Sequence, residues 1–508
     1  MAEPRVALVC FGKSILISSA VLLLILCITL SVDQLDLNIK RSRREIQEGN
    51  ISIHQEPLQS SDRNCTLRGI DSFPAGLFTS KQRINGAILI DFMIAVYLCG
   101  AISYICAAYF VPSTEMLGQQ MDLRPDVAGA TFMAAGSSAP EFFTAVIGTF
   151  VSMDDTGIGA IIGSAAFNIF VITAICCFFT CQPVVLTRWP FFRDIIVYVI
   201  SIILLSIALV DDRVEWWEGL ILSFGYVFYI GIMYFNSQLS AKSEEFILNL
   251  KTKFAEVEAD TEVETTKDGY GTVDHQPQVT AGDGEFKERI PSWRTEPPSQ
   301  SVFAPPDGLP WIVVWFFGLP VIFLFFITIP DCRKPGWQQS LYLVTFIMSA
   351  VWLAITTYVL YWMIAVIGYT LNVPDTVMGL SFLAAGTSLP DTVASMLVAR
   401  DGFGNMAMAN IFGSNIFEVF ACLGFLWFIA ALANGPVIIA SSAMAFDSAS
   451  LILMVVFIVF IIYLNNWTLN VKTGIFCVLS YIFYLSLSIL NELGVFGIVE
   501  TPNYCSHV

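Results

Sequence analysis

The sequence predicts an all-α, polytopic membrane protein made of two inverted five-helix repeats, with ten core transmembrane helices and an N-terminal signal peptide or anchor. Three observations support this prediction. Of the 508 residues, 56% are hydrophobic and only 13% are charged, whereas soluble globular chains carry about 25% charged residues. Apolar segments long enough to cross the hydrocarbon core recur along the chain. Finally, one pair of motifs occurs twice with the same spacing.

Composition also excludes several classes of function. A net charge of -17 disfavours a surface that binds nucleic acid. The three histidines, at positions 54, 275 and 507, lie outside the apolar segments, so an intramembrane histidine site is excluded. The sequence has no phosphate-binding loop and no recognisable nucleophile–base pair. We therefore expect a protein that is not an enzyme, has no cofactor, and has inorganic cations and the lipid bilayer as its partners; the oligomeric state is not predicted.

The N-terminal 86 residues divide into an apolar and a polar part. Residues 1–32 are interpreted as a signal peptide or an uncleaved anchor, because Lys13 precedes an apolar run at 14–32. The polar segment 33–86 carries the glycosylation sequons that begin at Asn50 and Asn64. We therefore expect this segment to be extracellular or lumenal.

The remaining chain divides into two sets of five apolar spans. The first repeat, 87–235, has spans at about 88–110, 127–152, 157–180, 192–210 and 217–235. The acidic, polar segment 236–308 is expected to be a cytoplasmic loop. The second repeat, 339–492, has spans at about 341–365, 376–399, 405–432, 447–465 and 473–491, and a C-terminal tail, 493–508, follows it.

The internal repeat is carried by two motifs. Residues 133–141 read MAAGSSAPE and residues 383–391 read LAAGTSLPD, 250 positions later. Residues 163–168 read GSAAFN and residues 413–418 read GSNIFE, again 250 positions later. Two motifs that recur in the same order at the same offset indicate a duplicated unit.

Three carboxylates fall in the middle of these apolar spans: Glu141, Asp391 and Glu418. A charged side chain there costs a few kcal/mol, so it is expected to have a function. The neighbouring hydroxyl and amide side chains are oxygen donors, which Ca²⁺ and Na⁺ prefer. Pro140 and Pro390 break the helix beside them and release backbone carbonyls. The sequence therefore predicts a midplane cation site on broken helices.

At these residues the chain resembles the cation/calcium antiporters, and within them the potassium-dependent sodium/calcium exchangers. The resemblance covers about 80–508 and is densest at 126–170 and 375–418. It implies a multi-pass antiporter, expected in the plasma membrane or else in an organelle membrane, that uses the Na⁺ gradient to expel Ca²⁺ with K⁺ alongside. By motif match, it implies that the ion site consists of Ser137, Ser138, Glu141, Ser164, Asn168, Thr387, Ser388, Asp391, Ser414 and Glu418.

Two positions depart from that family's pattern. Glu418 stands where the family usually has Asp, at a position tied to K⁺ dependence, and the extra methylene of Glu shrinks the cavity. The first span reads Cys106-Ala107-Ala108-Tyr109 where an acidic pair is usual. The alternatives that remain are a potassium-independent exchanger, a proton-driven exchanger, a channel, and a scaffold with a vestigial site.

Lysine and arginine placement predicts the topology. With 33–86 outside, five spans place Arg188 in the cytoplasm, as the positive-inside rule prefers. If the apolar segment 309–338 does not cross, Arg333, Arg400 and Lys472 are cytoplasmic too and the repeats are inverted. We therefore predict that this segment is re-entrant or interfacial and that the C-terminus is external. Asp91 and Glu492, near span ends, are interpreted as interfacial carboxylates, and a disulfide between Cys65 and Cys505 is a further hypothesis.

Overall fold

The computed structural model describes residues 69–121, 134–180, 184–235, 309–334, 337–400, 402, 404–439, 441, 443–493 and 495. Several predictions lie outside these residues. They concern the signal peptide or anchor, the sequons at Asn50 and Asn64, the 236–308 loop, most of the C-terminal tail, and the pair Cys65 and Cys505.

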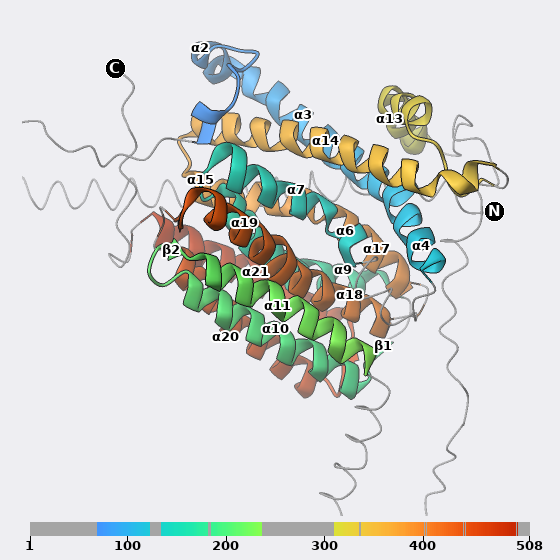
Figure 1. Cartoon of the computed structure of the whole chain (residues 1–508), viewed down its shortest axis with the longest axis vertical. Helices are drawn as coiled ribbons and strands as arrows, with labels where there is room; N and C mark the ends of the chain where they lie inside the picture. Colours follow the sequence, from blue (N-terminus) through green and yellow to red (C-terminus); the bar gives the residue numbers. More distant parts are fainter. Residues whose placement is uncertain are drawn as a thin grey trace, which may run out of the picture.

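The first five-helix set follows three short elements, η1 (Gly69–Ser72), α2 (Ser80–Gln82) and η2 (Arg83–Ala87). Its first helix is long and runs through three segments (Figure 1). The set comprises α3 (Ile88–Ile105), η3 (Cys106–Phe110) and α4 (Val111–Gln120); α6 (Ala134–Ser137), α7 (Ala139–Ile147) and η5 (Gly148–Ser152); α8 (Thr156–Phe167), η6 (Asn168–Ile172) and α9 (Thr173–Phe179); α10 (Arg188–Ala208); and α11 (Trp216–Tyr234).

The second set repeats this order of long, broken and continuous helices. It follows α13 (Leu309–Thr328) and η8 (Trp337–Leu341). It comprises α14 (Tyr342–Leu371); α15 (Asp375–Met378), η9 (Gly379–Leu383), α16 (Ala384–Thr387) and α17 (Leu389–Arg400); α18 (Gly404–Phe417), η10 (Glu418–Leu423) and α19 (Gly424–Asn434); α20 (Ala443–Leu464); and α21 (Val471–Glu492).

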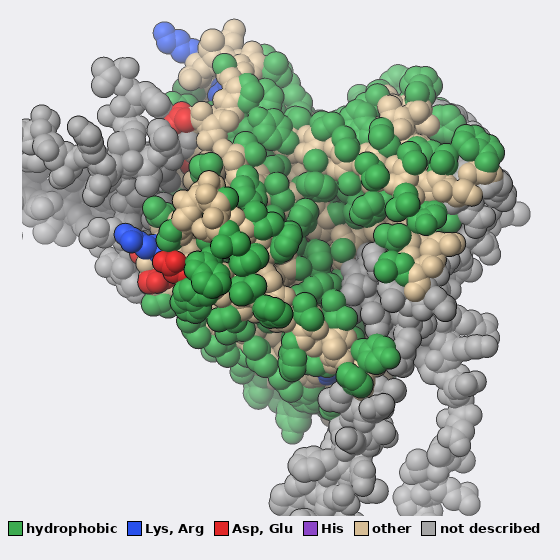
Figure 2. All heavy atoms as spheres, in the orientation of Figure 1, with side chains coloured by type: hydrophobic (Ala, Val, Ile, Leu, Met, Phe, Trp, Pro, Cys, Tyr) green, Lys and Arg blue, Asp and Glu red, His purple; other side chains and the backbone are tan. Residues whose placement is uncertain are grey.

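The length and hydropathy of these helices fit a membrane protein. Among the described residues, eight helices can cross a membrane, and the bent pair from α15 to α17 makes a ninth. The tenth, α6–α7–η5, is shorter in the described part because residues 122–133 before it are outside that part. Figure 2 shows hydrophobic side chains over most of one face, with a few charged side chains, mostly along its upper and left edges. The predicted all-α, polytopic fold is therefore confirmed.

Two short antiparallel strand pairs show that the repeats are inverted. Helix α10 runs from β1 (Val184–Val185) to β2 (Arg213–Val214), and its counterpart α20 runs from β3 (Val437–Ile438) to β4 (Thr468–Leu469). Strand β1 pairs with β4, and β2 pairs with β3. The two helices therefore run in opposite directions between the same two ends of the bundle, as the charge pattern predicts.

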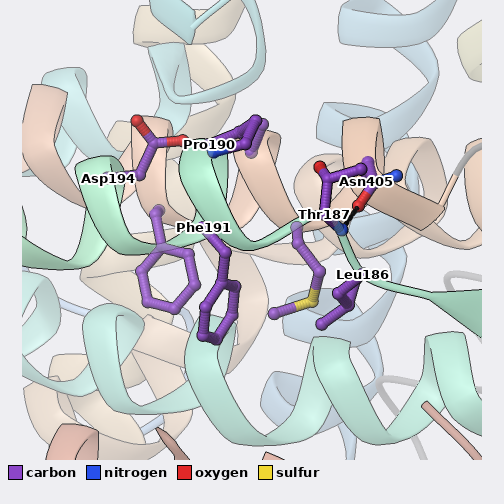
Figure 3. Close-up of a pocket in the computed structure, with 9 residues that line it drawn as sticks. Leu186, Thr187, Pro190, Phe191, Asp194 and Asn405 are labelled. Carbon is purple, nitrogen blue, oxygen red and sulfur yellow. Dashed lines mark hydrogen bonds between the residues drawn. The ribbon is translucent and has the colours of Figure 1, made fainter. Parts of the chain in front are cut away.

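These strand pairs define two ends of the molecule. At the β1–β4 end, Arg188 begins α10 and Lys472 lies in the first turn of α21. A small pocket here is shown in Figure 3, where the backbone N–H of Thr187 donates to Asn405 Oδ1 at 2.8 Å. This bond ties the start of α10 to the start of α18. At the β2–β3 end, Asp211 and Asp212 follow α10.

The segment before the second repeat folds as helix α13, with Pro320 inside it. Figure 1 shows α13 nearly end-on, whereas α10, α11 and α20 run across the view. It packs against α3. A helix lying across the bundle agrees with an interfacial segment, and the prediction that 309–338 does not cross the membrane stays a prediction.

The interpretation of Asp91 and Glu492 as interfacial carboxylates is wrong. Asp91 is only 2% exposed to solvent, and Glu492 only 1%. Asp91 is covered because the short helical turns α2 and η2, which precede α3, bring Arg83 to 3.8 Å from the Asp91 carboxylate. Glu492 is covered by Thr376 and Ser441, whose hydroxyls donate to its carboxylate. The apolar pattern of the two spans does not reveal which polar side chains cover these carboxylates.

Candidate cation-binding site

Broken helices place one carboxylate of each repeat in the interior. The chain leaves the helix at Ser138 and at Ser388, and Pro140 and Pro390 lie in the first turns of the helices that resume there. Proline is suited to a first turn, because no N–H partner is needed there. The second-repeat helix bends by 46° at this break. Glu141 and Asp391 therefore lie in the first turns of α7 and α17.

The second motif of each repeat ends on a π-helical turn. The π turn η6 begins at Asn168, and η10 begins at Glu418, 250 positions later. Such turns insert an extra residue into a helix and are frequent at functional sites. The same local irregularity therefore occurs at matched positions of the two repeats, on α8–η6 and on α18–η10.

The two repeats meet so that three carboxylates converge. One ligand oxygen from each of Glu141, Asp391 and Glu418 lies within 4.8 Å of the other two. All three residues are at most 1% exposed. No ion pair reaches any of them in the described part of the chain. Three acids this close in a water-poor interior are compatible only with bound cations or protons.

Hydrogen-bond donors reach these carboxylates unequally. Glu418 accepts from Ser164 Oγ and, at 3.4 Å, from Asn168 Nδ2. The same Asn168 amide donates to Asn415 Oδ1 at 2.9 Å. By contrast, none of the carboxylate oxygens of Glu141 and Asp391 has a partner among the described residues. No well-formed hydrogen bond therefore reaches these four buried oxygens, although the hydroxyls of Ser137, Ser138 and Ser414 lie near Asp391 and that of Ser388 lies near Glu141.

The hydroxyl side chains complete an oxygen-rich lining. Ser138 and Ser388, at the two helix breaks, have Oγ atoms without a partner in the described part. Ser137, Thr387 and Ser414 instead donate to carbonyls of their own helices, which leaves their hydroxyl lone pairs available as ligands. All ten residues implied by the motifs are buried, and they lie on the broken helices and π turns described above.

Sequence reasoning missed two polar residues. Asn415 is fully buried, and its side-chain oxygen accepts a hydrogen bond from the Asn168 amide, which also donates to Glu418. Its repeat counterpart is Ala165, so a search for matched polar positions does not find it. Thr144, one turn after Glu141, is also buried, with no partner for its hydroxyl in the described residues. Its counterpart is Ala394. A search for every polar side chain in the motif spans would have found both.

Comparison with known proteins adds to this geometry. The model of the family described as "Sodium/calcium exchanger protein" matches residues 92–235 and 341–490. These two matched segments together span more than half of the chain.

The chain belongs to this family. It is similar to human sodium/potassium/calcium exchanger 5, with 40% identity over 85% of this chain and 89% of that protein. It is also similar to human sodium/potassium/calcium exchanger 4, with 33% identity over 87% of each chain. A solved structure of the sodium-calcium exchanger NCX_Mj resembles it with a TM-score of 0.42 and 18% identity, over 78% of this chain and 98% of that chain. The resemblance predicted from the two motifs is confirmed.

Proposed function

We propose that this exchanger family member is a secondary active antiporter that moves Ca²⁺ against Na⁺ at the site of Glu141, Asp391 and Glu418, with K⁺ carried alongside Ca²⁺. The observation that carries the proposal is the convergence of three buried carboxylates within 4.8 Å without a cationic side chain in the described part. Its relatives are sodium/potassium/calcium exchangers by name. Oxygen ligands of this kind suit hard cations.

Exchange follows from competition for a single set of oxygens. Glu141 and Asp391 hold four acceptor oxygens with no well-formed hydrogen bond in the described residues, so an entering cation displaces no protein hydrogen bond there. Ca²⁺ and Na⁺ would use the same oxygens, and binding of one would exclude the other. Ser164 and Asn168 orient Glu418 toward them from α8–η6.

Alternating access supplies the coupling. When cations are bound, the site is close to neutral and can be closed to both sides of the membrane. When the site is empty, its negative charge faces a low-dielectric barrier, and the movement between the two open states costs more free energy. The broken helices carrying Glu141 and Asp391 are related by the inverted repeat. Movement of one repeat against the other around the fixed site would then open opposite ends in turn.

The second candidate is exchange without K⁺. Glu418 favours it, because the longer side chain reaches further into the site than Asp would and leaves less space for a large ion. A proton-driven exchanger is the third candidate. All three share the carboxylate site and differ only in the ions that drive the flux.

The test is Ca²⁺ uptake into liposomes that hold the purified protein, with Na⁺, K⁺ or pH gradients imposed one at a time. We expect uptake to follow an outward Na⁺ gradient and to be lost in Glu141→Gln and Asp391→Asn. Asp211→Asn, which changes an exposed carboxylate at the β2–β3 end, is the matched control and should retain uptake. Full Na⁺-driven uptake in either site variant would refute the assignment. Uptake driven only by a pH gradient would favour the proton-driven alternative.

A further inference from the structure

A second pair of buried carboxylates lies at the β2–β3 end, apart from the cation site. Asp447 lies near the start of α20 and Glu492 at the end of α21. The two residues are 0% and 1% exposed. Helices α20 and α21 pack against each other, and Ser441, which binds Glu492, lies two residues before α20.

The two carboxylates have opposite hydrogen-bond environments. Glu492 accepts from the Thr376 hydroxyl, and Ser441 Oγ lies 3.1 and 2.9 Å from its two oxygens. Neither oxygen of Asp447 has a well-formed hydrogen bond among the described residues, and the Ser488 hydroxyl of α21 is the one donor group that lies near it there. Formed hydrogen bonds therefore stabilise the ionised Glu492, whereas an ionised Asp447 would have only the nearby Ser488 hydroxyl to offset its lost hydration.

The first repeat shows how such a carboxylate is otherwise neutralised. Strands β1 and β3 begin at Val184 and Val437, 253 positions apart, and the same offset relates Asp194 to Asp447. Asp194, labelled in Figure 3, accepts from Arg193 Nε at 2.8 Å and Nη2 at 3.0 Å. The residue before Asp447 is Phe446, whereas the residue before Asp194 is Arg193. The guanidinium of the first repeat thus has no equivalent beside Asp447.

We propose that Asp447 binds a proton, so that Asp447 and Glu492 form a proton site distinct from the cation site. A proton on Asp447 removes the cost of an unsolvated charge there and its repulsion with Glu492. The proton belongs on Asp447 because donated hydrogen bonds already stabilise the Glu492 anion. A metal cation is disfavoured here, because the hydroxyl protons of Thr376 and Ser441 point at Glu492 and occupy the ligand positions.

The groups that face Asp447 leave no other source of positive charge in the described part. Helix α21 brings Glu492 and Tyr484. Ahead of α8, Asp155 accepts from the backbone N–H of Ser441 at 2.6 Å, and α8 itself has no titratable side chain. The last two turns of α10 contain no titratable residue and contribute Ser206, which hydrogen bonds with Ser448 at 3.0 Å.

The proton site is connected to the cation site through α15. Thr376, which donates to Glu492, lies in α15, and the same broken helix continues through η9 and α16 to Asp391 in α17. Loss of the proton would add a second buried negative charge and push α20 away from α21, the helix that Thr376 of α15 contacts through Glu492. The exchange rate is therefore expected to fall as the pH rises enough to deprotonate Asp447.

The test is infrared spectroscopy of the full-length, purified protein in lipid at neutral pH. Wild type should show a carbonyl band of a buried, protonated carboxylic acid that Asp447→Asn removes. Asp194→Asn, the matched change in the first repeat, should leave the band intact. This readout does not depend on the proposed exchange function. A band unchanged in Asp447→Asn would overturn the proposal.

Transport gives an independent readout of the same site. Asparagine imitates a permanently protonated Asp447, so Asp447→Asn should keep the flux at neutral pH and lose the alkaline fall. An alkaline fall of unchanged size, or a loss of one equivalent of bound Na⁺ or Ca²⁺, would overturn the proposal. If Asp447→Asn fails to fold, Glu492→Gln replaces it, since the Asp447 band should then persist at a shifted frequency; its disappearance would contradict the assignment.

Discussion

At the residue scale, the three carboxylates of the site are not equivalent. Ser164 and Asn168 donate hydrogen bonds to Glu418, whereas no well-formed hydrogen bond reaches Glu141 or Asp391 in the described residues. A carboxylate with fixed donors keeps one orientation, and a carboxylate without donors can turn toward whichever ion enters. We infer that the Glu418 carboxylate keeps one orientation and that the Glu141 and Asp391 carboxylates turn toward the cation that enters.

Removing the donor to Glu418 should weaken ion binding. Hydrogen bonds to charged groups contribute about 1.5–3 kcal/mol, so Ser164→Ala should lower the apparent Ca²⁺ affinity by about tenfold to a hundredfold. Ser480→Ala is the control, because the Ser480 hydroxyl donates only to the Phe476 carbonyl of its own helix. The measurement is the Ca²⁺ concentration for half-maximal uptake in liposomes. Equal values in the two variants would contradict the role of Ser164.

Shortening Glu418 should change its response to K⁺. In Glu418→Asp the carboxylate withdraws by one methylene and leaves space for a larger ion. We expect K⁺ to stimulate Na⁺-driven Ca²⁺ uptake more strongly in this variant than in wild type. Uptake should be measured with K⁺ and with an impermeant organic cation in its place. An identical K⁺ response in both proteins would show that the length of this side chain does not set K⁺ coupling.

At the element scale, the site depends on close packing between helices of the two repeats. Gly163 lies on α8, and a Cβ added there would come within 2.2 Å of the Leu380 carbonyl oxygen of η9. Its counterpart Gly413 has space, since the nearest atom to an added Cβ is the Tyr229 hydroxyl at 3.6 Å. The inverted repeat is therefore asymmetric where its helices touch.

This asymmetry makes a prediction with a built-in control. Gly163→Ala should force α8 away from η9, lower the free energy of unfolding by about 1–3 kcal/mol, and abolish most Ca²⁺ uptake. Gly413→Ala should change the free energy of unfolding and the Ca²⁺ uptake only slightly. Thermal unfolding in detergent and uptake in liposomes measure the two effects. If both variants behave alike, the α8–η9 contact does not position the site.

Hydrogen bonds and a ring contact hold a short segment before the first helix at the β2–β3 end. The Gly69 N–H donates to Asp375 Oδ2 at 2.9 Å, and Ser72 Oγ donates to the Ser152 carbonyl at 3.2 Å. The ring of Phe73 lies 5.6 Å from that of Tyr361, whose hydroxyl donates to Asp154 at 2.6 Å. This segment, 69–73, therefore joins η5, α14 and α15 at one end of the bundle.

Substitution at Gly69 should release this segment. An added Cβ would lie 2.0 Å from Asp154 Oδ2, so Gly69→Ala must displace either that carboxylate or the segment itself. We expect a lower melting temperature and faster proteolysis near residue 69. Gly231→Ala is the control, because nothing lies within 4 Å of an added Cβ there. Unchanged proteolysis in Gly69→Ala would mean that the segment is not held by these contacts.

At the scale of the whole molecule, the inverted repeat and the charge distribution give one topology. Because the strand pairs place Arg188 and Lys472 at the same end, the positive-inside rule puts that end in the cytoplasm. We therefore predict that the β2–β3 end, with Asp211 and Asp212 after α10, faces outward.

This topology can be tested by labelling with an impermeant thiol reagent. Trp337, which is 74% exposed, precedes α14, and Asp211 is exposed at the opposite end. In a background without the cysteines that lie outside the described residues, Asp211→Cys should react in intact cells, and Trp337→Cys only after permeabilisation. External labelling of Trp337→Cys would mean that α13 crosses the membrane.

Much of this architecture could be predicted from the sequence, for a physical reason. Apolar spans must satisfy their backbone hydrogen bonds internally and therefore become helices, and a buried charge such as Asp391 is conspicuous in them. The matched motifs gave the positions where helices break. Asp447 and Glu492 could not be predicted in this way, because their burial depends on α21, α15 and Ser441 meeting in space. Asn415 escaped prediction because its repeat counterpart is alanine.

The central claim is that Ca²⁺ and Na⁺ compete for one site made by Glu141, Asp391 and Glu418. Equilibrium binding of radioactive Ca²⁺ to the purified protein, with Na⁺ titrated in, tests it most directly. We predict that Na⁺ displaces all specifically bound Ca²⁺, and that Glu141→Gln and Asp391→Asn lose this binding while Asp211→Asn keeps it. Ca²⁺ that remains bound at saturating Na⁺, or that binds normally to the two site variants, would contradict a shared carboxylate site.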